Sequence, residues 1–292
     1  MGQSLVYKAN ALVQASYRLS LYEQRVVLAC ISQVRRDEPL TDQHMYTVSA
    51  QEIAAETGVG LKTAYRHLKT AAERLYRREV TLHGAPNGKD ADKPKLTRWV
   101  QTIEYRDDEG TVALRFGTDM VPYLSQLTQQ FTKYALADVS RMTSAHAIRL
   151  YELLCQWRDV GQREVSVAWL REVLQLEGRY DRIPDLKRWV IEPAVKQINE
   201  HSPMTVAWSQ RKTGRRVTHL TFTFETKEAK ARRTRYRPTR AEIKAAARPG
   251  ETEHQVRERL IQEHHQRKQE ELAQKAGEPE YSDEEDQLGM AF

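Results

Sequence analysis

The spacing of apolar residues divides the chain into helical and strand-like segments that recur in one order. Helix, strand, helix, turn, longer helix and hairpin follow one another twice. In the first occurrence we expect these elements at residues 20–36, 46–48, 50–56, 61–78, 98–104 and 111–116. In the second we expect them at residues 145–160, 164–167, 169–174, 184–200, 205–208 and 217–224. This order predicts an α+β fold of two tandem winged helix-turn-helix domains.

Two serine residues mark helix starts by local chemistry. Ser20 precedes Glu23 by three positions, and Ser49 precedes Glu52 by the same spacing. In such a capping box, each side chain satisfies a free backbone N–H of the first helical turn. Gly58 stands where the second of these helices needs a C-cap. These residues therefore predict helix boundaries independently of the apolar pattern.

The longest helical pattern of the second occurrence lies at residues 184–200. Pro184 suits a helix start, because its missing N–H has no helical partner there. Pro193 lies inside the helix, where it removes one backbone hydrogen bond and is expected to bend the helix. The apolar stripe that helical spacing predicts consists of Leu186, Trp189, Val190, Ala194 and Ile198.

Composition narrows the class of protein. The 292 residues suggest about two domains, and the net charge of +6 suits a polyanionic partner without requiring one. Cys30 and Cys155 lie in apolar helical patterns, so we expect small core residues in a reducing compartment. No apolar run approaches the ~18 residues of a membrane span, and the N-terminus has no signal-peptide pattern. We expect a cytoplasmic protein with no membrane partner.

The start of the helix at residues 184–200 provides candidates for contact with double-stranded DNA. In a helix-turn-helix, the first residues of the second helix meet base edges in the major groove. Arg can pair with guanine, and Asp can accept a hydrogen bond from cytosine. The candidates are Arg179, Tyr180, Arg182, Asp185, Lys187 and Arg188. The alternative is that these residues form a solvated helix face.

Two further groups of basic residues fit contact with DNA. The hairpin turn after that helix carries Arg211, Lys212, Arg215 and Arg216, with no acidic residue nearby in the sequence. Phosphate contact explains this cluster better than local ion pairing. The polar face of the helix at residues 61–78 carries Lys62, Thr63, Arg66 and Lys69. Phosphate contact, base contact and solvation all fit this second group, and we expect some contact with DNA.

The sequence lacks the patterns of other chemistries. Residues 84–90 place three residues between two glycines where a phosphate-binding loop has four, and Asp90 stands where that loop needs Ser or Thr. The His residues show no metal-ligand spacing, and no His-hydrophobic-His triplet accompanies a tyrosine as in DNA-nicking enzymes. We expect no catalytic site, no metal and no cofactor.

The composition changes after Thr226. Residues 227–248 are strongly basic, residues 252–276 have the pattern of a solvated or nascent helix, and residues 278–286 are acidic. Too little apolar surface is present for a packed third domain. The expected organisation is therefore an N-terminal domain at residues 1–140 for DNA contact and dimerisation, a C-terminal DNA-reading domain at residues 141–226, and a flexible, charged tail at residues 227–292 that is largely disordered or partly helical.

Several segments together resemble one known family. They are residues 8–13, 17–25, 131–134, 147–154, 180–188, 198–199 and 218–222. Through them, residues 5–226 resemble the iteron-binding replication initiators (Rep proteins) of theta-replicating bacterial plasmids. The resemblance implies two winged-helix domains of shared ancestry. It also implies a monomer that binds direct repeats at an origin, a dimer formed through the first domain that represses its own promoter, and host replication proteins as partners.

The resemblance also implies roles for individual residues. Carried over by position, the base readers are Arg182, Asp185, Lys187 and Arg188. The first-domain contacts are Lys62, Thr63, Arg66 and Lys69. Nothing is carried over to the tail. A winged-helix transcriptional repressor without initiator activity is the alternative function.

The last six residues, 287–292, resemble the peptide that binds the bacterial polymerase sliding clamp. Gln287 would form hydrogen bonds at the rim of a pocket, while Met290 and Phe292 would bury apolar surface. The position of this peptide at the end of a flexible tail suits a tethered ligand. The alternative is an unstructured apolar chain end. The hypothesis adds the sliding clamp to the expected partners.

Overall fold

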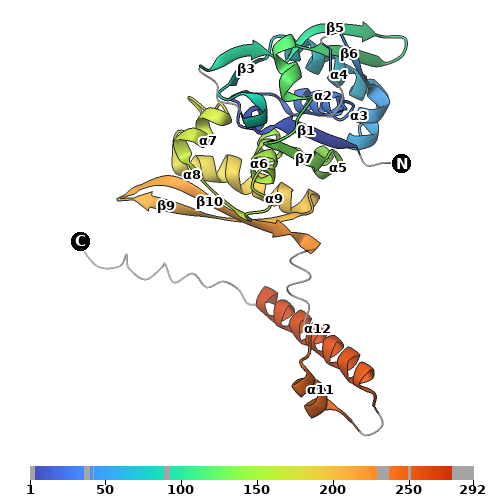
Figure 1. The fold of residues 1–292 in the computed structure, drawn as a ribbon, viewed down its shortest axis with the longest axis vertical. Coiled ribbons are helices and arrows are strands. Elements are labelled where there is room, and N and C mark those ends of the chain that lie inside the picture. Colours follow the sequence, from blue (N-terminus) through green and yellow to red (C-terminus); the bar gives the residue numbers. More distant parts are fainter. Residues whose placement is uncertain are drawn as a thin grey trace, which may run out of the picture. The chain divides into compact units, whose positions relative to one another are not determined.

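The computed structural model describes residues 4–35, 40–41, 43–88, 93–228, 237–248 and 251–277. The chain divides into two compact units, Met1–Lys227 and Glu228–Phe292, here called unit 1 and unit 2. Unit 1 contains both of the expected helix-turn-helix regions (Figure 1).

The first half of unit 1 builds a helix-turn-helix beside a three-stranded sheet. Its helices are α1 (Asn10–Val13), α2 (Leu21–Ile31), α3 (Ala50–Thr57) and α4 (Leu61–Leu75), with short helical turns η1 (Pro86–Gly88) and η2 (Thr118–Tyr123). Its strands are β1 (Leu5–Ala9), β2 (Tyr46–Ser49), β3 (Glu79–Leu82), β4 (Lys95–Arg98), β5 (Val100–Arg106) and β6 (Thr111–Phe116). Antiparallel pairing gives the sheet order β2–β6–β5 and a separate pair β3–β4. The hairpin β5–β6 is the wing of this half.

The second half repeats this order. β7 (Phe131–Ala135) pairs antiparallel with β1, and α5 (Ala137–Ser140) then leads to α6 (Ala145–Cys155). The elements that follow are β8 (Gln162–Ser166), α7 (Val167–Val173), α8 (Ile183–Leu186), η3 (Lys187–Ile191), α9 (Glu192–His201), β9 (Met204–Thr213) and β10 (Arg216–Thr226). The antiparallel sheet has the order β8–β10–β9, and β9–β10 is the long wing of this half.

Hydrogen bonds confirm the helix starts that were predicted from local chemistry. Ser20 N donates to Glu23 Oε2 at 2.7 Å, and Glu23 N donates to Ser20 Oγ at 3.4 Å. The same pair of bonds joins Ser49 and Glu52 at 2.9 and 3.1 Å. Gly58 ends α3 with φ +73°, a left-handed conformation that glycine adopts without strain.

Three strands and several helix ends differ from the sequence-based expectation. The helices expected at residues 20–36 and 61–78 end at Ile31 and Leu75. β1 and β7 were not predicted, since the buried Lys8 interrupts the apolar alternation of β1. β4 was not predicted either, since its mostly exposed side chains give no periodic signal. The predicted helix at residues 145–160 ends already at Cys155. The chain then turns back, and Phe224 N donates to Gly161 O at 2.8 Å.

Helix α6 lies at the centre of unit 1, between the strands β1 and β7 and the helix α9 (Figure 1). Residues 147–155 of α6 are all buried, because neighbours cover the helix on every side. Both cysteines are buried free thiols, as predicted. Trp99 and Tyr151 are among the largest fully buried side chains in the core.

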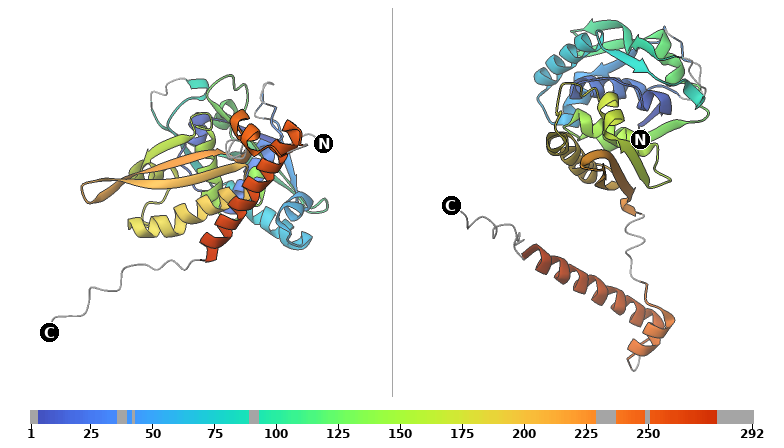
Figure 2. Two further views of the ribbon diagram at one scale, coloured as in Figure 1. Left: turned by 90° about the horizontal axis from the view of Figure 1, so that it is seen from below. Right: turned by 90° about the vertical axis from the view of Figure 1, so that its left-hand side faces the viewer.

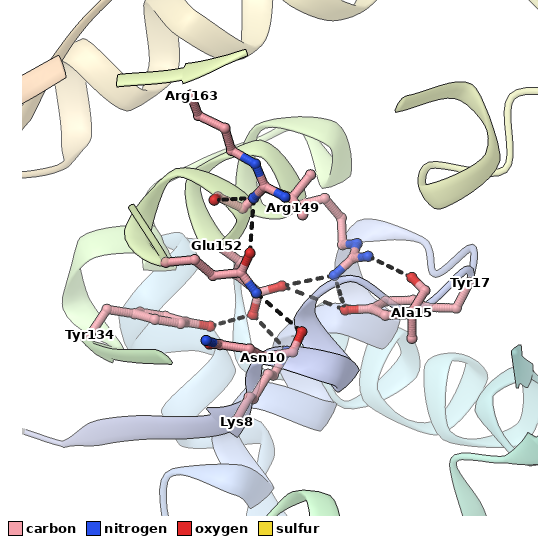
Figure 3. A network of polar contacts seen from close by, with 10 residues as sticks. Lys8, Asn10, Ala15, Tyr17, Tyr134, Arg149, Glu152 and Arg163 are labelled. Atoms are coloured by element: carbon pink, nitrogen blue, oxygen red, sulfur yellow. Dashed lines mark hydrogen bonds and ion pairs between the residues drawn. The ribbon is translucent and has the colours of Figure 1, made fainter. Parts of the chain in front are cut away.

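Buried charges join α6 to the N-terminal strand (Figure 3). Lys8 Nζ on β1 lies 2.6 Å from Glu152 Oε1 on α6, and Tyr134 on β7 donates to the same oxygen at 2.6 Å. Arg149 Nη1 lies 3.2 Å from Glu152 Oε2, and Arg149 Nη2 donates to Ala15 O at 2.9 Å. The contacts tie three separate segments of unit 1 to one turn of α6.

The charges of this cluster depend on one another. Burial alone raises the pKa of the Glu152 carboxyl, but Lys8 and Arg149 outweigh this effect and hold the pKa below its ordinary value. Burial also raises the pKa of the Tyr17 hydroxyl, to which Arg149 donates. Glu152 is therefore an anion that its two cationic neighbours keep ionised within the core.

Unit 2 contains a pair of helices, α11 (Arg240–Ala246) and α12 (Glu253–Gly277). Ile243 and Val256 are buried, and Arg259 bonds both Glu251, at 2.8 Å, and Ala246 O, at 2.7 Å. A helix was expected for α12 but not for α11, in which only one apolar side chain of the short segment is buried. Gln287, Met290 and Phe292 lie outside the described residues.

Among the described helices, none combines the length and apolar character that crossing a membrane requires.

Candidate DNA-binding surface

Helix α4 presents its predicted polar face to solvent. Ala64, Leu68, Ala71, Ala72 and Leu75 are buried on the other face. Lys62 and Arg66 are exposed, and Thr63 and Lys69 are partly exposed. Leu61, the first residue of α4, is apolar but 53% exposed. The candidates of the first half therefore lie on one accessible helix face.

Lys69 connects α4 to the first wing. Its Nζ lies 3.1 Å from Asp107 Oδ1 at the β5–β6 turn, and 5.2 Å from the centre of the Tyr105 ring. Tyr65 of α4 donates to the same carboxylate. These contacts hold the pKa of Asp107 below its ordinary value, with the hydrogen bond from Tyr65 as the largest cause. Sequence reasoning missed Tyr65 and Asp107, because their partnership requires the fold.

Arg171 of α7 fixes the turn that leads into α8. Its guanidinium donates to the backbone oxygens of Arg179, at 3.1 Å, and Asp181, at 3.2 Å, and also to that of Tyr180. Tyr180 adopts φ +54°, an unusual conformation for a residue with a side chain. Arg179 donates to the Tyr180 hydroxyl at 3.2 Å. Two of the predicted contact residues therefore belong to a turn that Arg171, which the sequence did not single out, holds in place.

The other candidates of the second half lie on the helix that α8, η3 and α9 form together. Arg182 is the N-cap of α8, and Asp185 lies in its first turn. Arg182 and Arg188 are exposed, while Asp185 and Lys187 are partly exposed. Lys187 Nζ lies 5.5 Å from the centre of the Trp208 ring on β9. The aromatic ring favours the cation and orients it beside the second wing.

Trp189 departs from the predicted apolar stripe, since 56% of its surface is exposed. The cause is a π-helical turn: Glu192 N donates to Lys187 O, five residues back, where an α-helix would bond four residues back. Leu186 and Ile191, five positions apart, are consequently both buried. The extra residue in this turn rotates Trp189 away from the core.

The second wing carries the basic hairpin tip. Lys212, Arg215 and Arg216 are exposed, and none forms an ion pair with another residue in the described part of the chain. Arg211 does form an ion pair, since its Nη2 lies 2.8 Å from Glu164 Oε1 on β8. This ion pair was not predicted. Arg211 therefore links β9 to β8. A phosphate that contacts the Arg211 guanidinium would have to share it with Glu164.

The two candidate helices lie along one side of unit 1. In both views of Figure 2, the light-blue helices of the first half and the yellow helix of the second half follow the same side of the molecule. A single duplex along this side would meet both helices. Within the described residues, no group of His, Cys, Asp or Glu side chains is placed to hold a metal ion.

Comparison with known families identifies both halves. The family described as "Initiator Replication protein, WH1" matches residues 5–155, and "Initiator Rep protein, WH2" matches residues 166–224. The chain belongs to the initiator replication proteins. The match confirms the predicted α+β fold with two winged-helix domains. The first match ends at residue 155 and so includes α6. In this initiator, α6 therefore belongs to the family's first domain and also packs in the core of the second half.

Relatives of the initiator share most of its length. An uncharacterised 27.6 kDa protein of Escherichia coli is 28% identical over 220 residues, which cover 72% of this chain and 91% of the relative. A replication initiation protein of Escherichia coli is 26% identical over 234 residues, which cover 77% and 71%. The crystal structure of the Pi initiator protein in complex with iteron DNA aligns with a TM-score of 0.65 and 24% identity, covering 77% of this chain and 98% of that one. This likeness shows that the initiator has the same fold.

Proposed function

We propose that the chain initiates plasmid DNA replication by binding iterons, the direct repeats of a replication origin. Membership of the family supports this role, and the Pi initiator protein of the same fold has been crystallised in complex with iteron DNA. The observation that carries the proposal is the pair of helix-turn-helix units on one side of unit 1, each with exposed cations on its second helix.

The two halves divide the contact with DNA. Arg182, Asp185, Lys187 and Arg188 read base edges, since they lie at the start of a recognition helix. Arg179 and Tyr180 approach the backbone from the preceding turn. Lys212, Arg215 and Arg216 contact phosphates from the wing, with Arg211 beside them. Lys62, Thr63, Arg66 and Lys69 provide the contacts of the first half.

Self-association extends this role. A monomer binds the iterons, while a dimer that forms through the first domain represses the chain's own promoter. Host replication proteins act on the opened origin in the cytoplasm, and the protein itself supplies no catalytic step. The alternative is a winged-helix repressor whose only output is control of transcription.

Footprinting on the native origin DNA distinguishes these functions. Protection of several direct repeats is expected of an initiator. Protection of a single inverted repeat, with no direct repeat occupied, would support the repressor instead.

The sliding clamp is a separate proposed partner, through residues 287–292. Deleting these residues should abolish capture of the purified clamp while leaving iteron affinity unchanged. Equal capture by the shortened chain and the full chain would exclude this peptide as the clamp ligand.

A further inference from the structure

Trp189 occupies an unusual position for so large an apolar side chain. Its side chain is 56% exposed. It lies in the π-helical turn η3, which joins α8 to α9 in the recognition helix of the second half. Burying a side chain of this size favours folding, so leaving it in solvent forgoes that stabilisation. An exposed aromatic residue on a binding surface is commonly an anchor for a partner.

Pro193 provides the physical reason for this position. In a regular α-helix, its ring would clash with the carbonyl of Trp189, four residues back, and its missing N–H would leave that carbonyl unpaired. The π turn of residues 187–191 enlarges the helix immediately before Pro193. The same enlargement turns the Trp189 ring outward. A proline inside the helix and a tryptophan on its surface are therefore two aspects of one feature.

The Trp189 ring has a cationic neighbour. The guanidinium carbon of Arg188 lies 5.0 Å from the centre of this ring, within the range of a favourable cation–π contact. Packing beside the ring restricts the rotamers of Arg188. Its N–H groups remain available, because Arg188 forms no ion pair with another described residue. Side by side on the surface, the two residues offer an apolar plane and a planar set of hydrogen-bond donors.

In the major groove, these two chemistries have distinct complements. Guanine presents O6 and N7 to a guanidinium, and thymine presents its C5 methyl group to an apolar side chain. We propose that Trp189 determines specificity by packing against the methyl group of a thymine, beside the guanine that Arg188 reads. This inference rests on the proposed function, because it requires the recognition helix to enter the major groove of an iteron.

Replacing thymine by uracil removes only the methyl group and thereby tests the contact. Duplexes are first selected from a random-sequence library by the full, unaltered chain. Each thymine of the selected site is then changed to uracil, one at a time. We expect a loss of about 4-fold in affinity at one thymine, the effect of removing one buried methyl-sized group. Trp189→Ala should bind the thymine and uracil duplexes equally at that position.

Two further variants complete the design. Trp189→Phe retains an apolar ring and should retain the preference for thymine. Trp157→Ala removes another exposed tryptophan, which lies outside the helix-turn-helix elements, and should show the full preference of the unaltered chain. Thermal unfolding of each variant checks that it folds, as is expected for exposed positions.

The outcomes separate this inference from the function on which it rests. If selection by the unaltered chain yields no sequence preference, iteron recognition itself fails. If a preference exists but Trp189→Ala keeps the same penalty for uracil, or the unaltered chain shows no penalty at any thymine, only the role of Trp189 is wrong. Uniform weakening of all duplexes by Trp189→Ala would indicate packing against the sugar-phosphate backbone and would also overturn the inference.

Discussion

Arginine residues with the same charge occupy different surroundings on the candidate surface. Arg188 is exposed and lies beside the Trp189 ring. Arg211 forms an ion pair with Glu164, and Arg171 donates its hydrogen bonds to backbone oxygens. Only the first is arranged to give a base all its hydrogen-bond donors. Counting basic residues therefore overestimates how many of them are free to contact DNA.

Replacing Arg188 should change specificity as well as affinity. Loss of a bidentate contact to guanine costs about 1–3 kcal/mol and relaxes the preference at one base pair. Binding of Arg188→Ala to single-base variants of the selected site measures both effects. Lys212→Ala is the matched control: loss of a phosphate contact should weaken all sequences alike and reduce the slope of affinity against salt by about 1. Equal weakening of all sequences by Arg188→Ala would contradict its assignment as a base reader.

His146, at the start of α6, should make folding sensitive to acid. Burial, together with the nearby charges of Arg179 and Arg18, lowers its pKa from 6.5 to about 4. The unfolded chain therefore takes up this proton at a higher pH than the folded chain. Stability that is present above pH 6.5 should be lost progressively as the pH falls toward 4. Urea unfolding across this range should show a shallower pH dependence for His146→Gln, and identical curves would exclude His146 as the cause.

At the scale of elements, local chemistry predicts much of the fold and then reaches a limit. The capping boxes and Gly58 could be predicted because each partner lies within a few residues of the other. Strand β1 could not, because Lys8 is buried only through Glu152, 144 residues further along the chain. Tyr65, Arg171 and Glu164 were missed for the same reason, since their partners come from other elements. The outward position of Trp189 was missed although Pro193 is visible in the sequence, because a proline predicts disturbance of a helix without giving its form.

Pro193→Ala should separate helix stability from DNA recognition. Alanine restores the missing donor and removes the clash, so the π turn can relax to an α-helix. The melting temperature should be unchanged or higher. Affinity for the selected site should fall, because residues 183–189 rotate relative to α9. Pro203→Ala, at an exposed position before β9, controls for loss of a proline as such. A variant that keeps full affinity would show that the π turn does not position the reader.

At the scale of the whole molecule, the buried charges around α6 hold the two halves of unit 1 together. Lys8 on β1 forms an ion pair with Glu152, 144 residues further along the chain. Arg149 pairs with Glu152 within α6 and also donates to the distant Ala15 O. Such pairs add little stability compared with an apolar core of the same shape, but removing one partner leaves an uncompensated buried charge. The cluster therefore favours one arrangement of its segments over others.

Glu152→Gln should destabilise unit 1 by about 3–5 kcal/mol, because two buried cations lose their anion. Urea unfolding measures this loss. The double variant Lys8→Met with Glu152→Gln should recover part of it, since only Arg149 then lacks a counter-charge. A double variant less stable than Glu152→Gln alone would contradict this account.

The position of α6, shared by both halves, has a consequence for the DNA as well. Helix α6 packs on α9, and both candidate DNA-contacting helices belong to the same compact unit. The protein therefore sets the distance between their two proposed contacts with DNA. A full turn of duplex takes about 10–10.5 base pairs. Inserting five base pairs between the two contacted DNA segments would turn one segment to the far side of the duplex. Inserting ten base pairs would return that segment to the original side, but it would lie one helical turn further away. The packing within unit 1 thus sets the helical phase that the two proposed DNA contacts require of each other.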